Sequence, residues 1–138
     1  MTDARKPAFS HPIEVRFRDC DPLGHVNNAV YLTYLEQARL FHWRTLWGFS
    51  LEGLGDGTPG VILARAEVDY RRAAKYGDRL EVRIFLASLG RTSFTYEYEI
   101  VDADGNLAAT ARTVQVMYDY AASKPVPIPP DIRGKLGT

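Results

Sequence analysis

The spacing of hydrophobic residues divides the chain into one strand, one long helix and four further strands. Residues 11–18 alternate apolar Ile13, Val15 and Phe17 with polar neighbours, which predicts a half-buried strand. Residues 28–47 contain no glycine or proline, and their apolar positions change to a helical period. The apolar residues cover most of the helix surface, so we expect it to be largely enclosed. One face carries Tyr31, Tyr34, Leu35, Ala38, Phe41 and His42.

The second half of the chain has the two-residue period of β-structure. Residues 61–72, 78–90, 91–102 and 106–120 alternate in this way, and Asp104-Gly105 signals a tight hairpin. No helical segment separates these strands, which argues against a parallel sheet with crossover helices. The pattern predicts an α+β fold in which an antiparallel five-stranded sheet wraps around one long central helix.

The connecting segments indicate one domain, residues 1–138, with a core of about residues 11–120. Residues 51–60 form a glycine-rich connection, and residues 121–138 form a proline-rich tail in which Pro129-Pro130-Asp131 opens a short helical turn. Such a sheet has open edges, and its strands are apolar on both faces. We therefore expect a homodimer or a homotetramer.

Composition narrows the classes of function. Seventeen basic and 17 acidic residues give 138 residues a formal net charge of zero, which offers no case for nucleic acid or an anionic membrane as partner. The single cysteine, Cys20, excludes an internal disulfide framework and a multi-cysteine zinc site. No apolar run approaches membrane-spanning length. We expect a cytoplasmic protein that uses neither a metal nor a cofactor.

The segment RDCDPLGHVNNAVY, residues 18–31, places more polar groups before an apolar helix than a turn requires. The stretch from Asp19 to Tyr31 resembles the hot-dog-fold acyl-CoA thioesterases of the 4-hydroxybenzoyl-CoA thioesterase family. The resemblance also rests on Glu36-Gln-Ala-Arg39 after this stretch and on Tyr70 and Tyr76-Gly-Asp78 before the third strand. The resemblance covers most of the chain. It implies a hot-dog fold and hydrolysis of an acyl-CoA thioester to the free acid and CoA.

Asp21 matches the position of the catalytic aspartate of that family, as nucleophile or general base. The structural alternative is an Asx-turn or a helix cap, and we expect Asp19 to be structural. A helix that begins near Asn27 or Asn28 would offer the Asn28 N–H to the oxyanion, as the resemblance also implies. Gly24 would let substrate approach the backbone closely.

Other polar residues can each be interpreted as catalytic or as structural. A related pattern in plant-type acyl-carrier-protein thioesterases has a catalytic histidine with an asparagine two residues earlier, but Leu23 stands there, so His25 is either catalytic or a loop residue. Asn27 and Asn28 are candidates to cap the helix. Glu36 either pairs with Arg39 or acts as a catalytic acid. We expect non-catalytic roles for the remaining candidates, Cys20, His42 and His11.

Substrate binding is expected elsewhere in the chain. The resemblance implies that the turn Arg91-Thr92-Ser93 binds the phosphates of CoA, and a solvated turn is the alternative. Tyr31 is a candidate to contact substrate and also to pack against the sheet. Arg71, Arg72 and Lys75 add local positive charge. The acyl group, and the choice between CoA and acyl carrier protein, stay open.

Two other classes of function compete with hydrolysis. A hot-dog hydratase or dehydratase usually carries a pattern like Asp-x-Asn-Pro-x-His, which Asp19 to His25 match only superficially. A non-catalytic acyl-binding module would have no need for the Asp21 carboxylate. A metal site built from Asp19, Asp21 and His25 is a further alternative.

Overall fold

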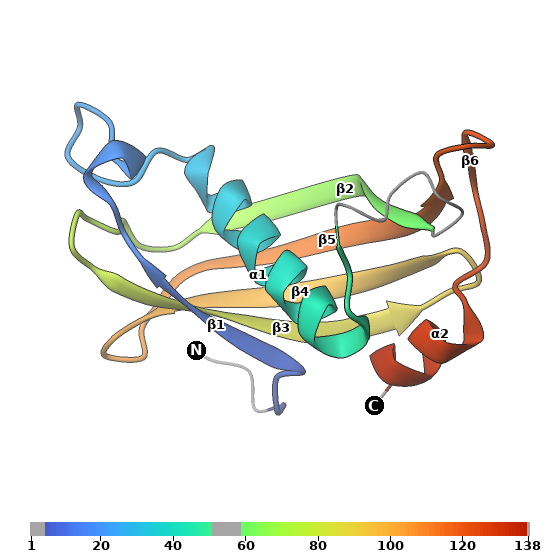
Figure 1. The fold of residues 1–138 in the computed structure, drawn as a ribbon. Coiled ribbons are helices and arrows are strands. Elements are labelled where there is room, and N and C mark those ends of the chain that lie inside the picture. The colour runs from blue at the N-terminus through green and yellow to red at the C-terminus, as the bar shows by residue number, and fades with distance from the viewer. Residues whose placement is uncertain (1–4, 51–58, 138) are drawn as a thin grey trace.

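The computed structural model describes residues 5–50 and 59–137, which form one antiparallel sheet with a long helix lying across it (Figure 1). The described elements are β1 (Phe9–Glu14), the 3-10 helix η1 (Phe17–Asp19), α1 (Val30–Trp47), β2 (Gly60–Tyr70), β3 (Arg79–Leu89), β4 (Ser93–Asp102), β5 (Leu107–Asp119), β6 (Lys124–Pro125) and α2 (Pro130–Leu136). The expected sheet and central helix are confirmed, with β6 as an additional short strand.

The strands lie in the order β1-β3-β4-β5-β2, and β6 pairs with the end of β5. Every pairing is antiparallel, with Ile13 opposite Leu80, Leu80 opposite Asp102, and Tyr98 opposite Ala111. This order leaves β1 and β2 as the two outer strands of the main sheet. β3 is eleven residues long, so its two ends lie at opposite ends of the sheet (Figure 1).

The core lies between α1 and the facing side of the sheet. Alternate residues of β4 point toward the helix, and Phe94, Tyr96 and Ile100 are fully buried. On the helix, Leu35 and Ala38 are fully buried. The short helix α2 adds Ile132 and Leu136 to the same core, together with Ile128 from the preceding segment. The short helix expected at Pro130 therefore completes the packing of the proline-rich tail.

Two features differ from the expectations. The first strand ends at Glu14, because the Asp19 carboxylate accepts a hydrogen bond from the Arg16 amide and closes the turn η1. Phe17 consequently points outward and is 77% exposed. The expectation that α1 is enclosed was wrong for Phe41, which is 40% exposed, and Leu32, which is 41% exposed.

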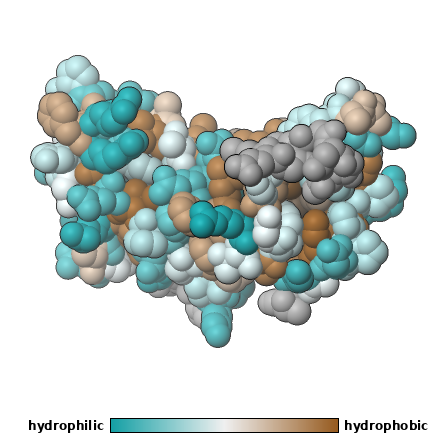
Figure 2. All heavy atoms as spheres, in the orientation of Figure 1, coloured by the Kyte–Doolittle hydropathy of each residue, from teal (hydrophilic) through white to brown (hydrophobic). Residues whose placement is uncertain are grey.

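The outer strand β2 leaves apolar side chains partly exposed on the side of the sheet that faces α1. Leu63 is 47% exposed and Tyr70 is 50% exposed. Figure 2 shows hydrophobic residues along the upper margin of the molecule, where β2 runs in Figure 1. The glycine-rich connection expected before this strand falls mostly on residues 51–58, which lie outside the described residues.

Candidate active site

Asp21 lies in a tight loop between η1 and α1. Cys20 and Val26 pair as an isolated antiparallel bridge, and the Asp21 amide donates to the His25 carbonyl oxygen over 3.1 Å. The turn is closed by the Gly24 amide, which donates to the Asp21 carbonyl oxygen over 3.0 Å. Gly24 has a φ of 91°, which favours glycine, and a Cβ there would meet no atom within 4 Å. The loop therefore presents open backbone at Gly24.

The C-terminal part of the loop, Val26 and Asn27, is held by backbone hydrogen bonds. The Val26 amide donates to the Ala74 carbonyl oxygen over 2.8 Å, and the Asn27 amide donates to the Asp19 carbonyl oxygen over 2.9 Å. Ala74 belongs to the connection between β2 and β3. Asp21 is thus positioned by the helix start on one side and by the sheet on the other.

The Asp21 carboxylate is partly exposed and accepts two hydrogen bonds. Oδ1 accepts from the Leu23 amide over 3.0 Å, which is the expected Asx-turn. Oδ2 accepts from the Asn27 side-chain amide over 3.4 Å. Both contacts hold the carboxylate in one orientation at the mouth of the loop, where it remains accessible. A catalytic role for Asp21 stays a prediction.

Asp19 has the structural role expected for it. Its side chain is buried and accepts from the Arg16 guanidinium over 2.9 Å and from the Tyr34 hydroxyl over 2.8 Å. Burial opposes ionisation of Asp19, but the hydrogen bonds from Arg16 and Tyr34 outweigh it and keep the pKa below its usual value. Burial and the neighbouring Asp19 carboxylate raise the pKa of Tyr34. Arg16, Asp19 and Tyr34 thus form a clamp around the Asp19 carboxylate, and Asp19, Asp21 and His25 do not form a metal-binding cluster among the described residues.

The start of α1 lies two residues later than expected, at Val30. Asn27 provides the cap of the preceding turn, because its Oδ1 accepts from the Ala29 amide and its carbonyl oxygen accepts from the Val30 amide, each over 3.0 Å. The Tyr70 hydroxyl donates to the Asn28 carbonyl oxygen over 2.8 Å. In the part of the chain that the structure describes, the Asn28 amide itself donates to no acceptor. This amide is therefore available to an incoming oxygen.

Other candidates in this region are placed as follows. His25 contributes its carbonyl oxygen to the loop, and Cys20 is half-buried with Sγ 3.9 Å from the Arg16 carbonyl oxygen. Tyr31 is buried and packs edge-on against Tyr70 at a ring distance of 5.2 Å. The sheet packing expected for Tyr31 is therefore observed, while its contact with substrate stays a prediction.

The helix residues Glu36 and Arg39 do not form the expected ion pair within the described chain. Glu36 is exposed, whereas Arg39 is buried and donates to the Tyr98 hydroxyl over 3.3 Å. Sequence reasoning missed this contact, as it missed those of Tyr34 and Tyr70, because the partners lie far apart along the chain and no local pattern records them.

The turn Arg91-Thr92-Ser93 lies at the end of the sheet opposite Asp21. It follows β3, whose start at Arg79 adjoins the Asp21 side of the molecule, and ten residue steps at about 3.3 Å each separate the two ends by about 33 Å. The turn is hydrogen-bonded to β5, because the Met117 amide donates to the Thr92 carbonyl oxygen, and to the tail, because the Ile128 amide donates to the Arg91 carbonyl oxygen. One chain does not bring Asp21 and Arg91 together.

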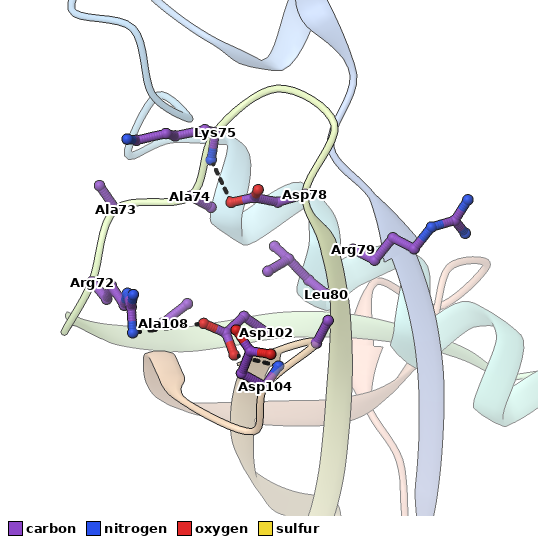
Figure 3. Close-up of a pocket in the computed structure, with 11 residues that line it drawn as sticks. Arg72, Ala73, Ala74, Lys75, Asp78, Arg79, Leu80, Asp102, Asp104 and Ala108 are labelled. Atoms are coloured by element: carbon purple, nitrogen blue, oxygen red, sulfur yellow. Dashed lines mark hydrogen bonds and ion pairs between the residues drawn. The ribbon is translucent and has the colours of Figure 1, made fainter.

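Arg72 and Lys75, but not Arg71, line a polar cavity of about 320 Å³ near the Asp21 loop. Figure 3 shows Arg72 beside Asp102 and Asp104, with Lys75 and Arg79 extending outward in different directions. Arg72 forms an ion pair with Asp102 at 3.8 Å, and the Asp78 carboxylate accepts from the Lys75 amide. The acidic side chains offset the basic ones, so this cavity lacks the net positive charge that a phosphate-binding site would have.

The structure also limits other classes of site. In residues 5–50 and 59–137, no cluster of three or more histidine, cysteine or acidic side chains is arranged to hold a metal ion. No helix among the described residues has the length and apolar character needed to cross a membrane.

Comparison with known proteins extends over nearly the whole chain. The sequence model of the Thioesterase-like superfamily matches residues 15–136. A 1,4-dihydroxy-2-naphthoyl-CoA hydrolase of Synechococcus elongatus is 31% identical over 117 residues, which are 83% of this chain and 85% of the relative. The acyl-CoA thioester hydrolase YbgC of Escherichia coli is 29% identical over 124 residues, which are 90% of this chain and 92% of the relative.

Solved structures agree with this result. A Thermus thermophilus thioesterase complexed with coenzyme A and Zn is 37% identical, has a TM-score of 0.80, and is matched over 94% of this chain and 92% of its own. A 1,4-dihydroxy-2-naphthoyl-CoA thioesterase from Synechocystis is 26% identical with a TM-score of 0.83, over 94% of this chain and 95% of its own. The resemblance carried by Asp19 to Tyr31 is confirmed, and with it the hot-dog fold. The chain therefore belongs to the Thioesterase-like superfamily, as a thioester hydrolase.

Proposed function

We propose that this protein hydrolyses an acyl-CoA thioester to the free acid and CoA, with Asp21 as the reacting carboxylate. The observation that carries the proposal is that Asn27 lies between the two groups that the reaction needs, a carboxylate and a free amide. Its side chain holds the Asp21 carboxylate, and the next residue, Asn28, presents an amide with no acceptor in the described chain. A carboxylate and an unpaired N–H at the start of a helix are the two groups that acyl transfer requires.

The reaction places charge on the carbonyl oxygen of the thioester. On one route, Asp21 takes a proton from water as the water oxygen attacks the carbonyl carbon, the carbon–sulfur bond then breaks, and the CoA thiolate takes up that proton from Asp21. On the other route, Asp21 attacks the carbon itself, the carbon–sulfur bond breaks to give a mixed anhydride, and the CoA thiolate leaves and takes up a proton from water before a second water cleaves the anhydride. On both routes the Asn28 N–H donates to the oxygen that becomes negative. The positive end of α1 adds a favourable potential at the same oxygen.

The position of Arg91 supports a site shared by two subunits. If Arg91 binds the phosphates of CoA, a distance of about 33 Å along β3 is too great for a substrate held at Asp21 of the same chain. A two-fold axis that pairs the open β2 edges antiparallel reverses one sheet relative to the other. The Arg91 turn of the partner then lies at the Asp21 end. We therefore propose at least a dimer.

The substitution Asp21→Asn tests the proposal. Asparagine accepts the Leu23 hydrogen bond as aspartate does, so a purely structural Asp21 predicts nearly unchanged turnover. A reacting carboxylate predicts that kcat falls by roughly two to four orders of magnitude. Release of CoA thiol from short, long and aromatic acyl-CoAs measures the rate, and Asp131→Asn, which changes an exposed acid of α2, is the matched control.

The outcomes separate hydrolysis from its rivals. A non-catalytic acyl-binding module binds acyl-CoA in the wild type without releasing thiol. A hydratase adds water to an enoyl-CoA and leaves the thioester intact. If folded wild-type protein releases no thiol from any of these substrates, or if Asp21→Asn stays within a few fold of wild type, the proposed mechanism is wrong.

A further inference from the structure

Arg39 lies at the start of a chain of buried hydrogen bonds that runs beneath α1. Its guanidinium donates to the Tyr98 hydroxyl over 3.3 Å. The Tyr98 hydroxyl contacts Thr113 Oγ1 at 2.5 Å, the Thr113 hydroxyl donates to Gln115 Oε1, and Gln115 Nε2 donates to the Phe94 carbonyl oxygen over 3.1 Å. Since Thr113 donates to Gln115, Tyr98 must donate to Thr113. Every donor in the chain thus points away from Arg39.

This chain of hydrogen bonds does not neutralise the guanidinium. It ends on a backbone carbonyl oxygen and contains no acid. Arg39 is 5% exposed and forms no ion pair with any residue that the structure describes. A buried charge is costly unless it is paired, and a guanidinium carries five N–H donors, of which the single contact to Tyr98 uses one. Among the described residues, Arg39 is therefore a buried cation without an anionic partner.

The guanidinium borders a cavity of about 330 Å³ between α1, the start of β2 and the end of β5. The volume is at the small end of the range for ligand pockets. Its wall is mainly apolar and is formed by Leu40, Trp43, Phe49, Val61 and Leu63. Glu36 also lines the cavity but is exposed, so its carboxylate lies at the rim, and Gln115 is already engaged in the buried chain. An apolar wall with one cation selects a ligand with an apolar body and one negative group.

The geometry points to a carboxylate-binding site in this cavity, in which Arg39 binds the carboxylate of an organic monoacid and the apolar wall holds its hydrocarbon or aryl body. A carboxylate matches the planar fork of arginine with two parallel hydrogen bonds. The free acid released by thioester hydrolysis belongs to this chemical class. The site does not require the proposed hydrolysis at Asp21, because Arg39 lies nine residues, or about 14 Å, along α1 from its first residue, Val30.

Direct binding tests this site without any reaction. Sodium octanoate is titrated into the full-length protein and followed by calorimetry and by tryptophan fluorescence, since Trp43 lines the cavity. Octanamide, which has the same chain without the charge, is the ligand control. We expect saturable binding of octanoate and at least tenfold weaker binding of octanamide. The comparison uses wild-type protein only, so it does not depend on the folding of a variant.

Variants locate the contact. Arg39→Met removes the charge at similar length and should weaken octanoate binding at least tenfold, whereas Arg39→Lys should retain part of it. Arg44→Met is the matched control, because Arg44 is an exposed arginine of the same helix that does not line the cavity. Glu36→Gln should tighten binding about twofold by removing repulsion at the rim.

Three results overturn the proposal. The first is no saturable binding of octanoate to wild-type protein; if Arg39→Met then also changes the oligomeric state, an acid of a second copy pairs with Arg39 instead. The second is equal binding of octanoate and octanamide. The third is equal binding of octanoate to wild type and to folded Arg39→Met.

Discussion

Tyr34→Phe tests the clamp that holds the Asp21 loop. It removes one oxygen atom and therefore one hydrogen bond of 2.8 Å to Asp19 Oδ2. Both side chains are almost wholly buried, at 4% exposure for Tyr34 and 2% for Asp19. A hydrogen bond to a charged group contributes about 1.5–3 kcal/mol. Asp19 keeps its bonds from Arg16 in the variant, so we expect a loss of about 2 kcal/mol in the free energy of unfolding.

The pH dependence of this loss follows from the pKa of Asp19. In the folded chain burial opposes ionisation, but the hydrogen bonds from Arg16 and Tyr34 outweigh it and hold that pKa below its usual value. The unfolded value is about 3.9. The contribution of the ionised group is therefore complete above the unfolded pKa and is lost as pH falls through the folded pKa. The difference between wild type and Tyr34→Phe should be constant from about pH 5 to 8 and shrink below about pH 4.

Urea denaturation at one fixed protein concentration measures both quantities. Tyr76→Phe is the control, because Tyr76 is 67% exposed, and its loss of stability should stay within about 0.5 kcal/mol. The hydroxyl of Tyr34 stays protonated across this range, since burial and Asp19 raise its pKa. A loss below about 0.5 kcal/mol at pH 7, or a difference that persists unchanged at pH 3, would refute the clamp.

Three further predictions concern other parts of the molecule. Arg91→Ala should raise KM for acyl-CoA and leave kcat nearly unchanged, with a smaller effect on a truncated pantetheine thioester; equal losses on both would place Arg91 in the fold. Light scattering should give a mass of at least two chains, and a fully active monomer would contradict the shared site. Burial lowers the pKa of His42 to about 4, so stability should fall by roughly 3 kcal/mol from pH 6.5 to 4 as the unfolded chain takes up a proton, and His42→Gln should flatten that slope in urea melts.

The sequence predicts the elements better than it predicts their contacts. The change from a helical to a two-residue period locates α1 and the long strands, and Asp21 to Gly24 are recognisable as a turn. The burial of Arg39 and the clamp between Tyr34 and Asp19 depend on pairings across 59 and 15 residues, which local spacing does not encode. The exposure of Phe41 has a related cause, because a helix that is apolar on most sides does not show which side its own sheet covers.

The contact between Tyr70 and Asn28 connects the rim of the sheet to the peptide before α1. Tyr70 is the last residue of β2, and its hydroxyl holds the carbonyl oxygen of Asn28, whose amide is the proposed oxyanion donor. A displacement of the end of this strand should therefore also move Asn28, which carries the proposed donor N–H on its other side. Substitutions along β2 should consequently alter the rate of reaction even where they touch no substrate. The positions that set the rate of the proposed reaction should thus extend beyond the Asp21 loop to a strand at the edge of the sheet.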